Sequence, residues 1–153
     1  MELIEFSIRV GLAVVAGLLI GAERELRGKS AGFRTNALVS LGACVFVLAS
    51  LTFKGEQHVD ITRVLGQVVS GIGFIGAGTI LQQKGSVKGL TTAATIWCSA
   101  GAGCLAALDM YKELAVVCVI IITINYAFGI LEMKIIQRKR KKSGDRKNSG
   151  DRS

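Results

Sequence analysis

The sequence contains no proline and only one histidine in 153 residues, and its four cysteines form no C-x-x-C pair. Without proline, a break in any helix would have to come from glycine. No spacing typical of a zinc site is present, so we interpret the cysteines as small apolar side chains. A G-x-x-x-x-G-K-[ST] phosphate loop, a Ser-His-Asp set and paired acids within apolar segments are also missing. We therefore expect the chain not to be an enzyme and to bind no cofactor.

Charged residues are scarce inside the long apolar runs. Half of all residues are hydrophobic and the mean hydropathy is +0.49. The runs are continuous rather than alternating, which favours helices over a membrane barrel. We predict an all-α, polytopic membrane helix bundle with five transmembrane helices. The predicted spans are about residues 3–22, 35–53, 63–84, 90–108 and 114–131.

Positive charge is concentrated near the C-terminus. The net charge is +8, and residues 134–153 hold nine Lys/Arg against two Asp. We predict a transmembrane domain over residues 1–133 and a basic, disordered tail over 134–153. This uneven distribution argues against a nucleic-acid partner. The loops on the side of the tail also carry the excess of Lys/Arg, which predicts an external N-terminus and a cytoplasmic C-terminus in a plasma membrane.

Glycine is unusually frequent in the third apolar segment. Its glycines are Gly66, Gly71, Gly73, Gly76 and Gly78, and the first segment carries Gly17 and Gly21. An interior glycine costs a soluble helix roughly 1 kcal/mol relative to alanine, whereas in lipid small residues let helix backbones approach closely. We therefore interpret these glycines as helix-packing positions. Leucine at Gly73 or Gly76 is expected to prevent accumulation of the folded protein.

The same segment matches the dinucleotide-binding pattern as Gly71-x-Gly73-x-x-Gly76. That pattern indicates a nucleotide site only after a strand and with an acidic residue about 20 positions later, and neither applies here. An unbroken helix and a helix interrupted between Gly71 and Gly78 both fit the segment, since discontinuous helices build midplane sites in transporters.

A row of polar residues begins just before the third segment and continues into it. Its candidate functional residues are Asp60, Arg63, Gln67 and Ser70. Steps of three and four place them on one helix face, which should point at protein or water rather than at lipid. Asp60 is also placed to cap the helix.

The first loop, predicted over residues 23–34, supplies a second group of candidates. These are Glu23, Arg24 and Arg34, on the predicted cytoplasmic side. Glu23 and Arg27 stand four residues apart and could pair along a helix end.

Three blocks, residues 21–43, 68–81 and 87–103, together resemble the MgtC/SapB family of bacterial membrane proteins. They read GAERELRGKSAGFRTNALVSLGA, VVSGIGFIGAGTIL and VKGLTTAATIWCSAGAG. The positions that we match in the third block are Thr91, Trp97 and Cys98, with Thr91 replacing an asparagine of other members. The resemblance implies an inner-membrane protein linked to growth in low magnesium. It also implies the rotary ATP synthase as a possible partner.

Two functions fit these sequence features. The first is a membrane regulator, associated with magnesium limitation or stress, that binds another membrane protein or a further copy of itself through intramembrane helix contacts. The alternative is a transporter or channel for Mg²⁺ or another solute. Carboxylates are the protein ligands of Mg²⁺, yet the acidic residues lie at the ends of the spans, so the sequence identifies no metal ligands.

Overall fold

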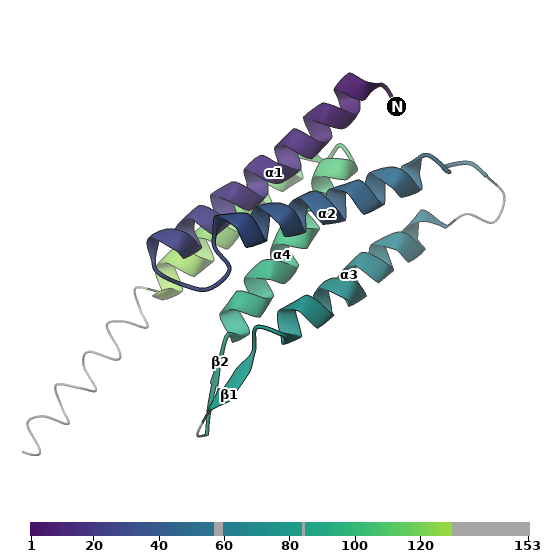
Figure 1. The fold of residues 1–153 in the computed structure, drawn as a ribbon. Coiled ribbons are helices and arrows are strands. Elements are labelled where there is room, and N and C mark those ends of the chain that lie inside the picture. The colour runs from purple at the N-terminus through teal and green to yellow at the C-terminus, as the bar shows by residue number, and fades with distance from the viewer. Residues whose placement is uncertain (57–59, 84, 130–153) are drawn as a thin grey trace, which may run out of the picture. The chain divides into compact units, whose positions relative to one another are not determined.

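The computed structural model describes residues 1–56, 60–83 and 85–129. The elements in chain order are α1 (Leu3–Leu26), α2 (Phe33–Leu51), α3 (Ile61–Ala77), β1 (Leu81–Gln83), β2 (Ser86–Lys88), α4 (Leu90–Ala107) and a last helix, Tyr111–Gly129 (Figure 1). Residues Met1–Ile122 form one compact unit, and the end of the last helix belongs to a second unit. The predicted basic tail lies outside the described residues.

The all-α, multi-pass architecture predicted from the sequence is confirmed. Four of the described helices are long and apolar enough to cross a membrane: α1, α2, α4 and the last helix. The fifth, α3, is a shorter apolar helix of 17 residues. At 1.5 Å per residue it extends about 26 Å, close to the roughly 30 Å thickness of a bilayer's hydrocarbon core.

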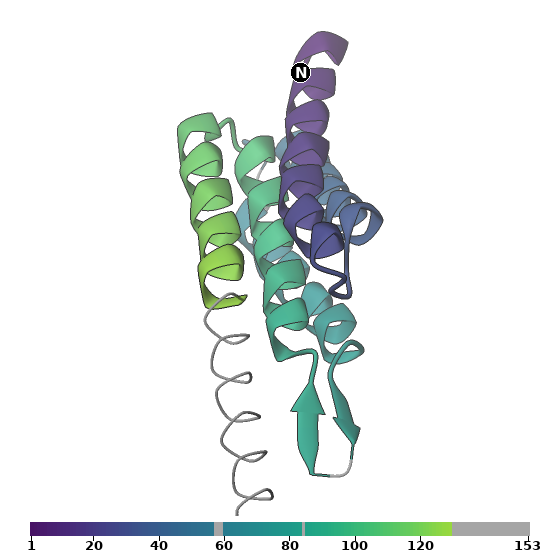
Figure 2. The same ribbon diagram turned by 90° about the vertical axis from the view of Figure 1, so that its left-hand side faces the viewer.

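The third apolar segment is not helical along its whole length. The helix is unbroken from Ile61 to Ala77, and β1 (Leu81–Gln83) then pairs antiparallel with β2 (Ser86–Lys88), with Leu81 opposite Lys88 (Figure 2). Gly85 and Gly89 adopt positive φ angles of 80° and 91°, which glycine tolerates better than other residues. The predicted span to residue 84 was therefore too long, because a hairpin replaces its final turns.

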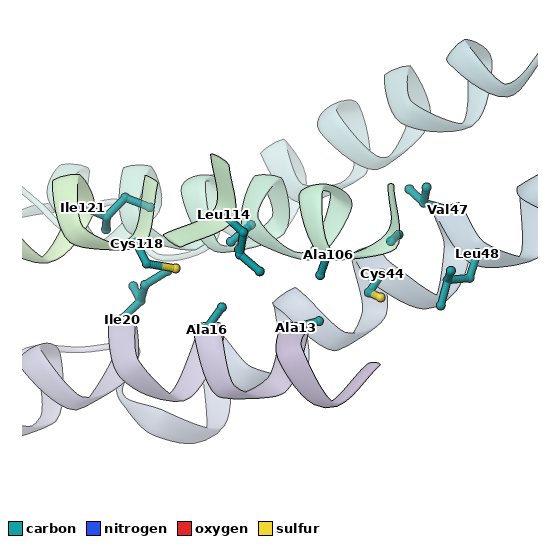
Figure 3. Close-up of a cluster of buried hydrophobic side chains, with 12 residues drawn as sticks. Ala13, Ala16, Ile20, Cys44, Val47, Leu48, Ala106, Leu114, Cys118 and Ile121 are labelled. Atoms are coloured by element: carbon teal, nitrogen blue, oxygen red, sulfur yellow. The ribbon is translucent and has the colours of Figure 1, made fainter. Parts of the chain in front are cut away.

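The core of the unit lies between α1, α2, α4 and the start of the last helix. Small side chains dominate it, including Ala13 and Ala16 of α1 and Ala106 of α4 (Figure 3). Larger side chains such as Ile20 and Leu48 fill the remaining space. This composition suits helices that approach closely without a hydrophobic driving force in lipid.

Three glycines bring the backbones of α1, α2 and α4 together. A Cβ atom on Gly17 of α1 would lie 2.5 Å from the Asn36 carbonyl oxygen, and one on Gly21 would lie 2.7 Å from the Gly32 carbonyl oxygen. A Cβ atom on Gly103 of α4 would overlap the Ser40 carbonyl oxygen even more closely. Side chains at these positions would clash with backbone atoms that cannot easily move away.

The glycines of α3 do not behave in this way. In the part of the chain that the structure describes, an added Cβ on Gly66, Gly71 or Gly73 would meet no atom within 4 Å. Among the glycines of this helix, Gly76 is the one at which an added Cβ would contact another described helix, 3.6 Å from the Cβ of Ala93. At Gly78 an added Cβ would meet carbonyl groups of the preceding turn. Among the described residues, no neighbour within the chain packs tightly against Gly66, Gly71 or Gly73, so close packing at these positions stays a prediction for contacts with another molecule.

The predicted first loop is also shorter than expected. Helix α1 continues to Leu26 and α2 begins at Phe33, so Glu23, Arg24 and Arg34 lie in helices rather than in a loop. Arg, Glu and Leu are good helix formers, and the helix ends before Gly28, whose φ is 60°.

Candidate functional site

A buried arginine joins the end of α1 to the start of α4. Arg24 is only 5% exposed. Its Nη2 donates hydrogen bonds to the Thr92 hydroxyl at 2.6 Å and to the Ser30 carbonyl at 3.4 Å. The Nε atom has no hydrogen-bond partner among the described residues. The contact between Arg24 and Thr92 ties together two helix ends that are 68 residues apart in sequence.

The neighbouring acid has a different partner. Glu23, which is 8% exposed, forms an ion pair with Arg27, with Nε and Oε1 separated by 2.9 Å. This is the i, i+4 pair that the sequence suggested. The pair lies at the C-terminal end of α1, with Arg27 as the residue that follows the last helical position.

A second buried polar contact lies where α2 meets α4. The Ser99 hydroxyl donates to Asn36 Oδ1 at 2.8 Å, and the Asn36 amide donates to the carbonyl oxygens of Ala31 and Gly32. Both Asn36 and Ser99 are fully buried. The Asn36 side chain therefore orders the turn before α2 and fixes α2 against α4. Together, Arg24, Thr92, Asn36 and Ser99 form what we call the inner polar cluster.

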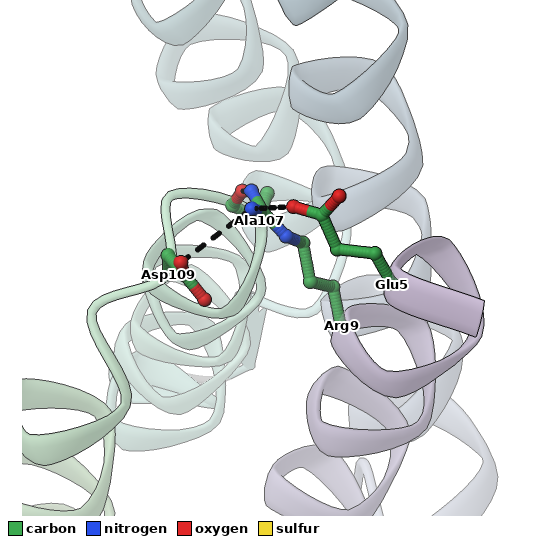
Figure 4. A network of polar contacts seen from close by, with 4 residues as sticks. All are labelled: Glu5, Arg9, Ala107 and Asp109. Carbon is green, nitrogen blue, oxygen red and sulfur yellow. Dashed lines mark hydrogen bonds and ion pairs between the residues drawn. The ribbon is translucent and has the colours of Figure 1, made fainter. Parts of the chain in front are cut away.

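A third polar network lies at the opposite end of α1. Arg9 pairs with Glu5 one turn earlier, donates to the Ala107 carbonyl at the end of α4, and lies 3.6 Å from Asp109 Oδ2 (Figure 4). Arg9 is mostly buried, whereas Glu5 and Asp109 are about half exposed. The mostly buried Arg9, which lies within α1, thus links this helix to the C-terminal end of α4.

The polar candidates on α3 are not brought together into a cluster. Asp60 caps the helix as predicted, accepting hydrogen bonds from the Thr62 N–H and hydroxyl at 2.9 and 2.6 Å. These bonds, led by the one from the hydroxyl, lower the pKa of the Asp60 carboxyl. Arg63 lies 3.8 Å from Asp60 and is largely exposed.

Helix α3 has three distinct sides. Leu65 and Gly76 turn toward the core and α4. Gln67 lines a groove beside α2. The third side, with the exposed Phe74 at its border, is exposed and carries small or polar residues: Arg63, Gly66, Ser70, Gly73 and Ala77. We call this third side the open face of α3.

The groove between α2 and α3 has a volume of about 550 Å³. Its walls include Leu38, Gly42 and Phe46 of α2 and Val64, Gly71 and Ile75 of α3. Among the described residues that line these walls, Gln67 alone has a polar side chain. We call this cavity the α2–α3 groove.

The family-matched positions lie on α4 with different degrees of exposure. Thr91 is exposed, Cys98 is half-buried and Trp97 is 51% exposed. Among the residues that the structure describes, no three His, Cys, Asp or Glu side chains are placed to hold a metal ion. The four cysteines are free thiols.

The sequence alone did not single out Thr92, Asn36 or Ser99 as a site. Each is a polar residue within an apolar segment, and such residues usually face protein. That signal was present, but it did not reveal which residues would meet, because their partners lie more than 60 positions away.

Comparisons with known proteins agree with this architecture. The MgtC family model matches residues 10–134. Protein MgtC of Salmonella typhimurium is 45% identical over 125 residues, covering 82% of this chain and 53% of the relative. Protein MgtC of Brucella abortus is 48% identical over 113 residues, covering 74% of this chain and 47% of the relative. The chain thus spans about half the length of these curated relatives, and no solved structure matches it. The length and identity of these matches show that the chain belongs to the MgtC family.

Proposed function

We propose that this protein is a regulator in the bacterial inner membrane that acts by binding another membrane protein through the open face of α3. The observation that supports this proposal is the combination of exposure and composition on that face. Arg63, Ser70 and three small residues are exposed there. Polar and ionisable groups within a membrane usually face protein or water, and small residues permit close helix contact.

The orientation that we propose has the N-terminus outside the cell. The inner polar cluster then lies toward the cytoplasm, together with Lys29, Arg34 and Lys88. The Arg9 network lies toward the outside. Support for this orientation comes from the uneven distribution of Lys/Arg between the two sides.

Transport of Mg²⁺ is the second candidate. The relatives' name and the family resemblance favour a link to magnesium. Against a conduit built from one chain, the acids of the described helices lie near helix ends, as Glu5, Glu23 and Glu113 do. A regulator that responds to magnesium limitation needs no such conduit.

Photo-crosslinking in native membranes tests the regulator proposal. A photoreactive amino acid at Gly73, on the open face, should give an adduct with a second membrane protein. Blotting the adduct for a subunit of the rotary ATP synthase would show whether that enzyme is the partner. The matched control is Gly101 of α4, which is exposed and has the same open surroundings in the described structure. Equal adduct formation at both positions, or none at Gly73, would contradict the proposal. Mg²⁺ flux in proteoliposomes of the pure protein would support the transporter instead.

A further inference from the structure

The α2–α3 groove, which is separate from the open face, has the character of a lipid site. We propose that it binds an acyl chain of an anionic glycerophospholipid whose phosphate is held by Arg34. Apart from Gln67, the side chains on the groove walls are apolar, as an acyl chain requires.

The length of the groove fits a chain from one leaflet. The α2 wall extends from Leu38 to Phe46 and the α3 wall from Val64 to Ile75. At 1.5 Å per residue these walls are about 12 and 17 Å long, close to half of the roughly 30 Å hydrocarbon core. A transmembrane helix of a second copy would need about twice that length of wall. The observed length therefore favours an acyl chain as the occupant.

Two glycines determine the width of the groove. Gly42 and Gly71 lie on opposite walls, and a Cβ on either would meet no atom within 4 Å in the described chain. Larger side chains at these positions could thus enter the groove without disturbing the packing of α2 or α3.

Arg34 lies where a headgroup would be. It is four residues before Leu38, so it continues the groove-lining stripe of α2 by one helical turn. Arg34 is exposed, and it forms no ion pair with the residues that the structure describes. At the other end of the groove, Arg63 already lies beside Asp60. A guanidinium binds phosphate in a two-pronged geometry, so an anionic phospholipid complements this end.

Native mass spectrometry of the delipidated full chain tests the proposal. The probes are phosphatidylglycerol and phosphatidylcholine with identical palmitoyl and oleoyl chains. We expect one tightly bound lipid, with phosphatidylglycerol favoured about fivefold by the single arginine. Arg34→Gln should abolish this preference, and Lys112→Gln, which changes an exposed cation on the last helix, should leave it unchanged.

Leucine substitutions test the groove itself. Gly71→Leu should abolish binding of both lipids, whereas Gly73→Leu, two residues away on the open face, should not. If Gly71→Leu fails to fold, Gly42→Leu fills the groove from the α2 wall instead and should abolish binding of both lipids. The proposal would be overturned if the folded groove variants bound lipid as the wild type does, or if the preference for phosphatidylglycerol survived Arg34→Gln. It would also be overturned if the wild type were a dimer that dissociates when leucine fills the groove. The crosslink at Gly73 reports separately on the proposed regulator, because that residue is not on the groove walls.

Discussion

Helices α1 and α4 use glycine differently from α3. Gly17, Gly21 and Gly103 let a neighbouring backbone approach so closely that no side chain would fit. Gly66 and Gly73, in equally apolar surroundings along the sequence, face open space in the described structure. A glycine in a membrane helix therefore marks a contact only when a neighbour faces it. On α3, we assign that neighbour to another molecule.

Polar side chains differ in the same way between α3 and the other helices. In α1, α2 and α4, buried Arg24, Asn36 and Ser99 have hydrogen-bond partners on another helix or in the turn before α2. On α3, Arg63 and Ser70 are exposed. The first group stabilises this chain, whereas we propose that the second contacts a partner.

The largest effect should come from filling a backbone contact. Gly17→Val would place a branched side chain against Asn36 and Ala37 of α2, where even a Cβ would lie 2.5 Å from an oxygen. Overpacking of this kind costs about 1–3 kcal/mol and occasionally more. We expect most of the variant to be lost from the folded, monodisperse fraction in detergent. Gly66→Val on α3 is the matched control, and an equal loss in both variants would remove the distinction between the helices.

Removing the Arg24 guanidinium should give the next largest effect. Arg24→Met leaves the Thr92 hydroxyl and the Ser30 carbonyl without their donor, at a cost of about 1–3 kcal/mol in the free energy of unfolding. Arg63→Met on the open face should change that free energy by less than about 0.5 kcal/mol. A double-mutant cycle with Thr92→Val should show that the two losses are not additive. Additive losses would mean that the hydrogen bond contributes nothing to stability.

A smaller effect is expected at the contact between α2 and α4. Ser99→Ala removes the donor to Asn36 Oδ1. Hydrogen bonds between membrane helices contribute about 0.6 kcal/mol on average and at most about 1.7. Unfolding in mixed micelles should detect this loss, while Ser70→Ala on the open face should show none. A larger loss at Ser70 would place that residue inside the fold.

The smallest effect should be a pH dependence at the start of α3. Because hydrogen bonds from Thr62 lower the pKa of Asp60 in the folded state, the ionised carboxylate stabilises α3 above the unfolded pKa of about 3.9. That contribution is lost as the pH falls through the lower, folded pKa. Asp60→Asn still caps a helix but does not titrate, so the difference in unfolding temperature between wild type and variant should shrink on acidification. A difference that grows on acidification would reverse this assignment.

Local patterns predicted much of the fold because the number and type of apolar helices and the Asp60 cap depend on nearby residues. The i, i+4 spacing of Glu23 and Arg27 likewise indicated their ion pair. The contact between Arg24 and Thr92 was not predictable, since it depends on how α1 meets α4. The same reason applies at Gly73: glycine spacing shows that a face is suited to close contact, but not which neighbour covers it.

Accumulation of Gly103→Leu and Gly73→Leu, compared side by side by fluorescence-detected size-exclusion chromatography, tests the distinction between the helices most directly. A Cβ atom at Gly103 would overlap the Ser40 carbonyl oxygen, whereas one at Gly73 would meet no atom within 4 Å among the described residues. We predict that Gly103→Leu is lost from the folded peak and that Gly73→Leu keeps the wild-type amount. Loss of Gly73→Leu together with survival of Gly103→Leu would contradict the account.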